Sequence, residues 1–168
     1  HPVSGEHLSD ESVGLIARYR QDSREQFNTQ IVISDGLNAL AVMDGDQVLD
    51  LVSLLRSELD GTEFVLSPEN LIVDSGRVRA GYRIGEQLFG NRDGNFTILH
   101  IIGERPGSGH HTLSIYMTRA GGPTWGTQDK VDHNITKVVS GIANTALTPD
   151  LGAVEAAKIL RQTDVSGR

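Results

Sequence analysis

The sequence predicts an α/β protein with three layers, in which an open sheet lies between two layers of helices. An apolar run over residues 96–102 leads directly into the polar segment Gly103-Glu104-Arg105-Pro106-Gly107. A shorter apolar run over 30–33 leads in the same way into Ser34-Asp35-Gly36-Leu37. Open α/β sheets bind their ligands where strands end in such loops, so the two loops indicate one shared site.

Capping residues and hydrophobic spacing predict the other elements in chain order. Ser9 and two following acids begin a helix that runs to about Arg20, after a loose arm over 1–8. Apolar residues from Val48 to Leu59 recur at helical spacing. Further helices are expected over 37–43, 76–89, 131–145 and 149–162, and strands over 31–33, 64–66, 71–73, 96–102 and 112–118. This alternation is typical of a three-layer α/β sheet.

Three segments carry more specific expectations. In the helix over 76–89, a narrow face of Gly81, Ile84, Gly85 and Leu88 allows a close approach to another element. Residues 112–118 alternate apolar and polar side chains, which predicts a half-exposed strand nearer an edge. Residues 120–128 are rich in glycine and are expected to form an irregular loop.

The composition of the chain limits the classes of protein to which it can belong. A length of 168 residues suits one domain, with an arm and helix over 1–28, the α/β domain over 29–163 and a fraying tail over 164–168. The net charge of −7 argues against a nucleic-acid partner. The absence of cysteine excludes disulfides and zinc–thiolate sites, and no apolar run is long enough to span a membrane. The first residue is His1 rather than Met, which indicates a trimmed or processed piece.

Three motifs occur in order and at compatible spacing in the chain. They are residues 32–37, then Gly76-Arg77-Val78 followed by Ile84-Gly85-Glu86, then residues 103–107. Over roughly 30–160, the set resembles the small (light) subunit of ethanolamine ammonia-lyase, an adenosylcobalamin-dependent enzyme. The resemblance implies a largely parallel sheet of the Rossmann or flavodoxin kind. It also implies a hetero-oligomer with a large TIM-barrel subunit that binds most of the substrate ethanolamine, in the cytoplasm or a bacterial microcompartment.

The family's cobalamin contacts carry over to residues of this chain through the motifs. They fall on Val78 and on Glu104. A third family contact is a cysteine in a Cys-Ile-Ser segment, and its nearest match here is Asn134-Ile135-Thr136, which makes Asn134 the candidate. Glu104 would accept hydrogen bonds from corrin amides, and Gly103 and Gly107 would allow close backbone approach. The chain departs from the family in a longer loop before Asn134 and in a shorter arm before residue 30, which indicates a fragment or a shortened relative.

Several candidate residues also have ordinary structural interpretations. Glu104 and Arg105 could form an ion pair that closes a turn, and Asp35 is expected to cap the next helix. His100 begins half of a cobalt-binding Asp-x-His-x-x-Gly motif, but Ile98 replaces the aspartate, so a buried core histidine is favoured. Other polar groups, namely the adjacent His110 and His111 and the cluster Asp129, Asp132 and His133, also lack a defined metal geometry.

Two other functions compete with the lyase subunit. One is a stand-alone flavodoxin-like module that binds a small molecule without catalysis, although no complete nucleotide-binding glycine motif follows a strand. The other is a hydrolase that uses Ser34 or Ser108 with His110, but no nucleophile elbow is present. A subunit should expose a broad apolar patch around the strand ends, and a monomeric module should not. The glycine face of 76–89 and the loop after 120 are the expected places.

Overall fold

The fold is built on one five-stranded sheet. The computed structural model describes residues 4–23, 26–104, 109–127 and 129–163. The strands are β1 (Thr29–Ser34), β2 (Leu71–Val73), β3 (Asn95–Glu104), β4 (Thr112–Gly121) and β5 (Thr136–Ile142), in the spatial order β2-β1-β3-β4-β5. β1 is parallel to β2 and β3, whereas β4 is antiparallel to β3 and β5. The α/β class is confirmed, but the sheet is mixed and the expectation of a largely parallel one is not confirmed.

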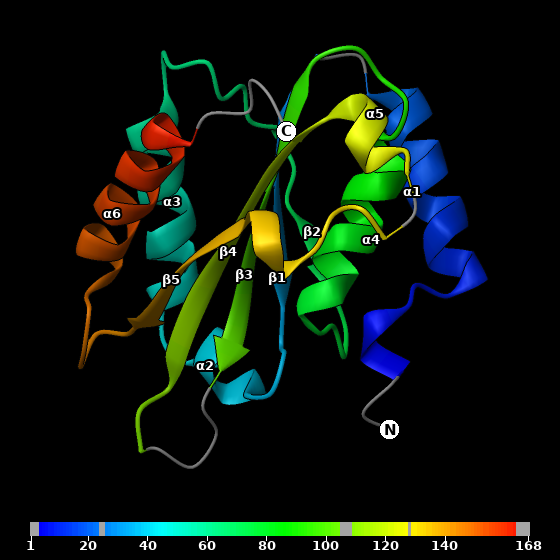
Figure 1. The fold of residues 1–168 in the computed structure, drawn as a ribbon. Helices are drawn as coiled ribbons and strands as arrows, with labels where there is room; N and C mark the ends of the chain where they lie inside the picture. The colour runs from blue at the N-terminus through cyan, green and yellow to red at the C-terminus, as the bar shows by residue number, and fades with distance from the viewer. Residues whose placement is uncertain (1–3, 24–25, 105–108, 128, 164–168) are drawn as a thin grey trace.

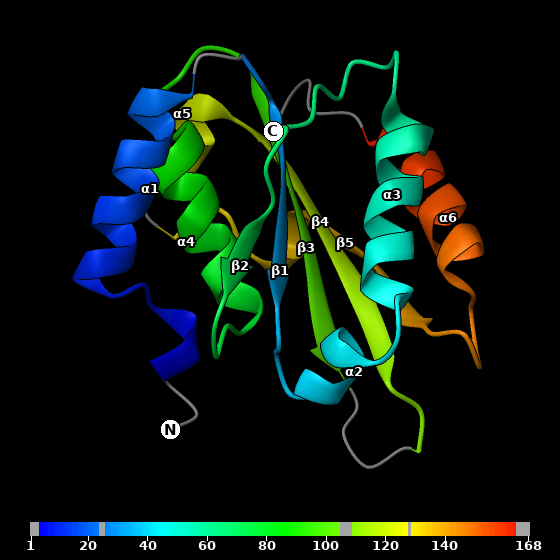
Figure 2. The same ribbon diagram turned by 180° about the vertical axis from the view of Figure 1, so that it is seen from behind.

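Helices cover both faces of the sheet, as Figures 1 and 2 show. α3 (Gln47–Leu59) and α6 (Pro149–Gln162) lie side by side on one face. α1 (Asp10–Asp22), α4 (Val78–Phe89) and the short α5 (Gly122–Trp125) lie on the other. α2 (Ala39–Met43) lies at the end of the sheet where β1 and β3 finish. The three predicted layers are therefore present. No helix in the described ranges is long and apolar enough to cross a membrane.

The α3 layer follows the spacing in the sequence closely. All five residues that define the predicted helical face are buried, and they pack on inward-facing residues of β1, β3 and β4. The five residues are Val48, Leu51, Val52, Leu55 and Leu59. Asp60 caps this helix and Thr148 caps α6, as predicted. Burial of this apolar face supplies the main stabilisation of this side of the sheet.

The α4 layer depends on two glycines. A Cβ atom on Gly81 would lie 2.6 Å from Nδ1 of His100, and one on Gly85 would lie 2.2 Å from the ring of Trp125. Trp125 is fully buried, and its indole N–H donates to the carbonyl of Phe96 across 3.2 Å. The predicted close approach of this helix face is confirmed. Because the face is buried, the expectation that it carries the exposed apolar patch is wrong.

The segment over 131–145 is not a helix. The predicted helix is wrong, although the apolar residues at 135, 138, 139 and 142 do have helical spacing. The structure instead has a short 3-10 helix, η2 (His133–Ile135), followed by the edge strand β5. Pairing with β4 satisfies the backbone of this β-branched segment, and Gly141 adopts a φ of 75° that a helix would not allow.

Four smaller predictions are also corrected. β4 is largely buried and lies between β3 and β5, so it is not a half-exposed strand. Residues 64–66 form only an isolated bridge, Thr29 to Leu66, because the chain leaves the sheet there. The loop after residue 120 contains α5. Residues 4–8 are not a loose arm, since η1 (Ser4–Glu6) packs on the start of α4 and Arg77 N–H donates to the carbonyl of Gly5. Residues 1–3 of the expected arm and the expected fraying tail over 164–168 lie outside the described residues.

Candidate functional site

The loops that follow β1 and β3 meet, as the sequence predicted. Ser34 pairs with Ile102 at the carboxyl ends of the two parallel strands. The turn after β1 then donates from Leu37 N–H to the carbonyl of Gly103 across 3.0 Å. A Cβ atom on Gly103 would lie 2.1 Å from the carbonyl oxygen of Asn38. The close approach that Gly103 permits is therefore to the chain itself rather than to a ligand, and Gly107 lies outside the described residues.

Asp35 joins this turn to α4. Its Oδ1 atom accepts a hydrogen bond from the backbone N–H of Gly76 across 3.1 Å. The expected role as a cap of the next helix is wrong, because α2 begins after Asn38 instead. The bond holds the loop before α4 against the end of β1, which brings Val78 beside the strand ends.

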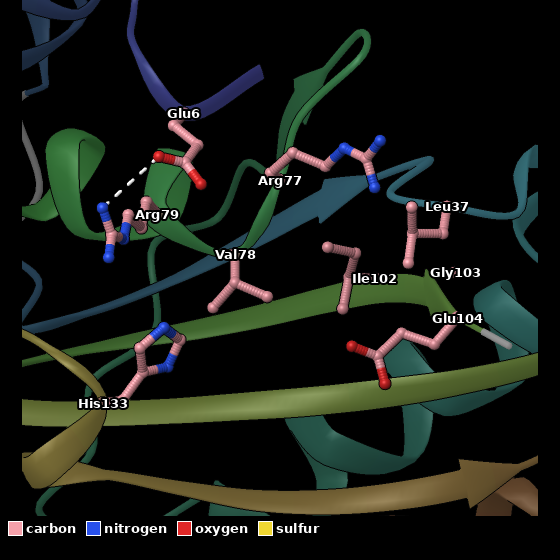
Figure 3. A pocket seen from close by; sticks show the side chains of 9 residues that line it. All are labelled: Glu6, Leu37, Arg77, Val78, Arg79, Ile102, Gly103, Glu104 and His133. Atoms are coloured by element: carbon pink, nitrogen blue, oxygen red, sulfur yellow. Dashed lines mark hydrogen bonds and ion pairs between the residues drawn. The ribbon is translucent and has the colours of Figure 1, made fainter. Parts of the chain in front are cut away.

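A pocket of about 480 Å³ opens at this point (Figure 3). Two of the three predicted site residues, Val78 and Glu104, line it from α4 and from the end of β3. The full lining is Glu6, Leu37, Arg77, Val78, Arg79, Ile102, Gly103, Glu104 and His133. Leu37, Val78 and Ile102 give the pocket an apolar wall, and Glu104 and His133 lie on opposite sides of it. A second pocket, of about 510 Å³, lies between α1 and α4, away from the predicted residues.

Two hydroxyl groups of β4 fix the carboxylate of Glu104. Ser114 Oγ donates to Oε2 across 2.8 Å, and Tyr116 Oη donates to Oε1 across 2.6 Å. Burial raises the pKa of the Tyr116 phenol above its usual value, and the bond to Glu104 raises it further. The alternative of an ion pair with Arg105 falls on a residue outside the described ranges.

A second polar group lines the pocket at His133. Its Nδ1 atom lies 3.1 Å from Oη of Tyr82, and the two rings meet edge to face with centroids 5.5 Å apart. Thr136 Oγ1 lies 3.2 Å from the same Tyr82 oxygen and 2.9 Å from the carbonyl oxygen of Asp132. Burial raises the pKa of Tyr82, and the Thr136 bond partly offsets that effect. The phenol therefore stays protonated and orients the histidine ring.

Asn134 lies directly beside His133 but does not line the pocket. Its side-chain amide donates to Oδ2 of Asp132 across 2.9 Å, and its backbone N–H donates to Oδ1 across 2.8 Å. The structure thus places this third predicted residue on a capped turn at the edge of the site. Its side chain is held by Asp132 rather than by the other predicted residues.

Basic side chains from the start of α4 add donors at the rim. Arg77 and Arg79 both line the pocket, and Arg79 forms an exposed ion pair with Glu6 at 3.4 Å. An exposed pair of this kind contributes little to stability. The pocket therefore combines an apolar wall, a fixed carboxylate, an imidazole and two guanidinium groups.

His100 is a core residue, as favoured from the sequence. It is 1% exposed, and its Nε2 atom lies 2.6 Å from Oγ of Ser34. Burial lowers its pKa to about 4, against a weaker opposing influence of the Val78 carbonyl. Nδ1 makes no well-formed hydrogen bond within the described residues. Because Ser34 is equally buried, this pair cannot meet a substrate, and the hydrolase hypothesis gains nothing from it.

The two adjacent histidines of the next loop have different partners. His111 Nδ1 lies 2.8 Å from Oδ2 of Asp44, which ties the loop to the end of α2. His110 Nδ1 lies 3.1 Å from Oγ1 of Thr145. Both contacts therefore connect the loop to its neighbours in the fold.

Exposed apolar side chains gather at the turn after β1 and on α2. Leu37 is 54% exposed, Leu40 60% and Met43 77%. Leu37 also lines the pocket, so this apolar surface continues into it. Exposed apolar surface beside a pocket favours a contact with another protein.

Sequence reasoning missed three residues that shape this site, namely Ser114, Tyr116 and Tyr82, and it considered His133 only as part of a metal cluster without defined geometry. The alternation over 112–118 did separate Ser114 and Tyr116 from the apolar face of the strand. Their contact with Glu104 depends on the antiparallel register, in which Thr112 lies opposite Glu104. No sequence signal indicated that register.

The fold and pocket define an α/β chain whose candidate ligand site opens at the carboxyl ends of its parallel strands, beside an exposed apolar surface. Residues 1–167 match the sequence model of the ethanolamine ammonia-lyase light chain (EutC) family. The chain belongs to this family, and the resemblance seen in its motifs is confirmed.

Individual relatives agree with the family match. The chain is 34% identical over 118 residues to the ethanolamine ammonia-lyase small subunit of Pseudomonas fluorescens (strain Pf0-1), covering 70% of this chain and 40% of that protein. It is 33% identical over 138 residues to the small subunit of Pseudomonas syringae pv. tomato, covering 82% and 45%. The small subunit of Pseudomonas aeruginosa (strain LESB58) is 32% identical over 138 residues, covering 82% and 47%. The chain thus spans less than half the length of these curated relatives.

Proposed function

We propose that this chain acts in an adenosylcobalamin-dependent ethanolamine ammonia-lyase, which converts ethanolamine to acetaldehyde and ammonia. It would do so as the small-subunit component of a hetero-oligomer with a large TIM-barrel subunit, which binds most of the substrate. Membership of the light-chain family supports the proposal. A location in the cytoplasm or a bacterial microcompartment rests on the family resemblance alone.

The residues of the pocket fit one edge of a cobalamin. A pocket of about 480 Å³ matches a drug-sized ligand, whereas a corrin with its nucleotide arm is much larger. The rest of the cofactor would therefore need another chain to cover it. The donor and acceptor groups also suit a macrocycle edged with amides, because Glu104 accepts hydrogen bonds and Arg77 donates them.

Each proposed contact residue has a distinct role. Val78 packs against the ring with its apolar side chain at the first turn of α4. Glu104 accepts amide N–H groups with a carboxylate that Ser114 and Tyr116 hold in place. Asn134 would approach from the turn beside His133. When bound, adenosylcobalamin would supply the radical chemistry, and the residues of this chain would position it and exclude water.

One observation carries the proposal more than any other. Val78 and Glu104 were selected from separate motifs, and they line the same pocket. Leu37 lines that pocket, and Leu40 and Met43 are exposed on α2, the helix that follows it in the chain; this exposed apolar surface favours a subunit over a stand-alone binding module.

Coexpression with the large subunit tests the proposal. The copurified complex should show a corrinoid absorption spectrum after addition of adenosylcobalamin and should release ammonia from ethanolamine. Glu104→Gln should weaken cofactor binding about tenfold through loss of a charged acceptor. Glu155→Gln is a matched control in the opposite helix layer, where Glu155 lies 3.6 Å from Lys158 on the same helix. A complex that binds no corrinoid would contradict the proposal.

A further inference from the structure

A buried histidine lies behind the pocket, against the helix that carries Val78. His100 is two residues before Ile102 and four before Glu104 on β3, so the three side chains project from the same face of the strand. Ile102 and Glu104 line the pocket, whereas His100 is fully buried. His100 therefore supports the pocket from behind and does not form part of its lining.

The first turn of α4 packs directly on the imidazole ring. A Cβ atom on Gly81 would lie 2.6 Å from Nδ1 of His100 and 3.1 Å from Cγ, so a glycine is needed for this close approach. Burial lowers the pKa of His100, and the carbonyl of Val78 is close enough to oppose that shift. Nδ1 makes no well-formed hydrogen bond in the part of the chain that the structure describes. The ring therefore holds the helix mainly by packing.

The ring is in turn held at the end of β1. Its Nε2 atom lies 2.6 Å from Oγ of Ser34, which is also buried. Ser34 supports the segment before α4 as well, because a Cβ atom on Gly76 would lie 2.9 Å from the Cβ atom of Ser34. Ser34 and His100 together therefore form one buried surface, against which the segment before α4 and the first turn of the helix both pack.

We propose that His100 is a positioning residue for Val78: its ring, oriented by Ser34, sets how closely the first turn of α4 approaches the ends of the strands. The inference rests on the proposed function, in which Val78 is a contact for the cofactor. Because the ring is fully buried and bonded to Ser34, a larger residue at Gly81 should displace the helix rather than the ring. That displacement belongs to the free chain and can be measured without a cofactor.

The methyl signals of Val78 in the carbon-13 NMR spectrum of the free chain test this placement. Gly81→Ala should shift them, because the new methyl group pushes the turn away from the ring. Ser34→Ala should also shift them, because it releases the ring but keeps the Cβ atom that faces Gly76. Gly14→Ala is the matched control, since a Cβ atom there has no heavy atom within 4 Å. Unchanged Val78 signals in Gly81→Ala or in Ser34→Ala overturn the inference.

Affinity for adenosylcobalamin tests the consequence for the pocket. The complex of this chain with its large subunit is titrated with the cofactor, and the corrinoid absorption spectrum reports binding. Gly81→Ala should weaken binding about tenfold. When His100→Ala is already present, the same change should weaken it less than about twofold, because no ring remains for the methyl group to meet. Ile101→Val changes a buried residue on the opposite face of β3 and should leave the affinity unchanged.

The outcomes distinguish the inference from the proposed function. Unchanged affinity in Gly81→Ala overturns the inference alone, and so does an equal loss with and without His100→Ala. A loss in Ile101→Val as large as that in Gly81→Ala also overturns it, since the effect would then be general. If His100→Ala does not fold, the Val78 signals of Gly81→Ala and Ser34→Ala decide. A wild-type complex without affinity for adenosylcobalamin overturns the proposed function, while the Val78 signals still test the placement.

Discussion

The hydroxyl of Tyr116 donates to Oε1 of Glu104 across 2.6 Å, from a strand that runs antiparallel to the one that carries the glutamate. The register explains how this contact arises. Glu104 lies opposite Thr112, so its side chain extends back along β4 past Ser114 to reach Tyr116. Because β4 is antiparallel, its first residues lie at the end of the sheet where the parallel strands β1 and β3 terminate.

Removal of the Tyr116 hydroxyl should destabilise the chain. Tyr116→Phe leaves the ring in place but deprives Oε1 of Glu104 of its donor, and a hydrogen bond to a charged group contributes about 1.5–3 kcal/mol. Urea unfolding at neutral pH measures the free energy of unfolding. The double variant with Ser114→Ala should lose less than the sum of the single changes if the hydroxyls act on Glu104 as a unit. An unchanged unfolding midpoint for Tyr116→Phe would contradict the prediction.

Acid should destabilise the fold through His100. Its folded pKa of about 4 lies below the ordinary 6.5, so the unfolded chain binds the proton more tightly. The stabilisation is complete above pH 6.5 and is lost as the pH falls toward 4, by up to about 3 kcal/mol. His100→Gln should flatten this dependence in unfolding curves measured across that interval. The exposed His7→Gln is the control, and an equal slope in wild type and His100→Gln would refute the prediction.

A methyl group at residue 103 should disturb the junction of the two loops. Gly103→Ala places Cβ 2.1 Å from the carbonyl oxygen of Asn38, a backbone atom that cannot move aside cheaply. We expect a loss of about 1–3 kcal/mol. Gly14→Ala, in α1 with no heavy atom within 4 Å of the new Cβ, should instead stabilise the chain by about 0.5–1 kcal/mol. Thermal unfolding of both variants checks the opposite signs.

Charge on the surface of α2 should prevent subunit association. Leu40→Asp and Met43→Asp change residues that are 60% and 77% exposed, so neither should alter the fold. If α2 adjoins the large subunit, each change should reduce copurification severalfold. Leu151→Asp alters an equally exposed leucine on α6 and should have no effect. Equal recovery of the partner with all three variants would exclude α2 from the interface.

Periodicity predicted the α3 layer because one buried face fixes the spacing of five apolar residues from Val48 to Leu59. The same rule failed at β5. Ile135, Val138, Val139 and Ile142 have helical spacing, yet pairing with β4 determines their structure. Local pattern does not encode partners that are distant in the sequence, and this limits prediction at edge strands.

The candidate site, like the fold, could be predicted from the sequence only in part. Glu104 and Val78 could be proposed because the family resemblance carries its cofactor contacts onto the motifs that contain them. Tyr116 could not be proposed, and His133 could not be placed in this pocket, because their positions depend on strand register and on a contact with Tyr82 from another layer. When the role of a side chain depends on residues that are distant in the sequence, the local sequence around it contains no motif that would reveal that role.

The only tryptophan of the chain, Trp125, lies wholly within the layer of α4. Its intrinsic fluorescence therefore reports unfolding of the α4 layer and does not report unfolding of the opposite layer, where α3 and α6 pack. Circular dichroism, in contrast, averages over both layers. Melting curves recorded by the two methods would coincide for a single cooperative transition and would separate if one layer loosened before the other.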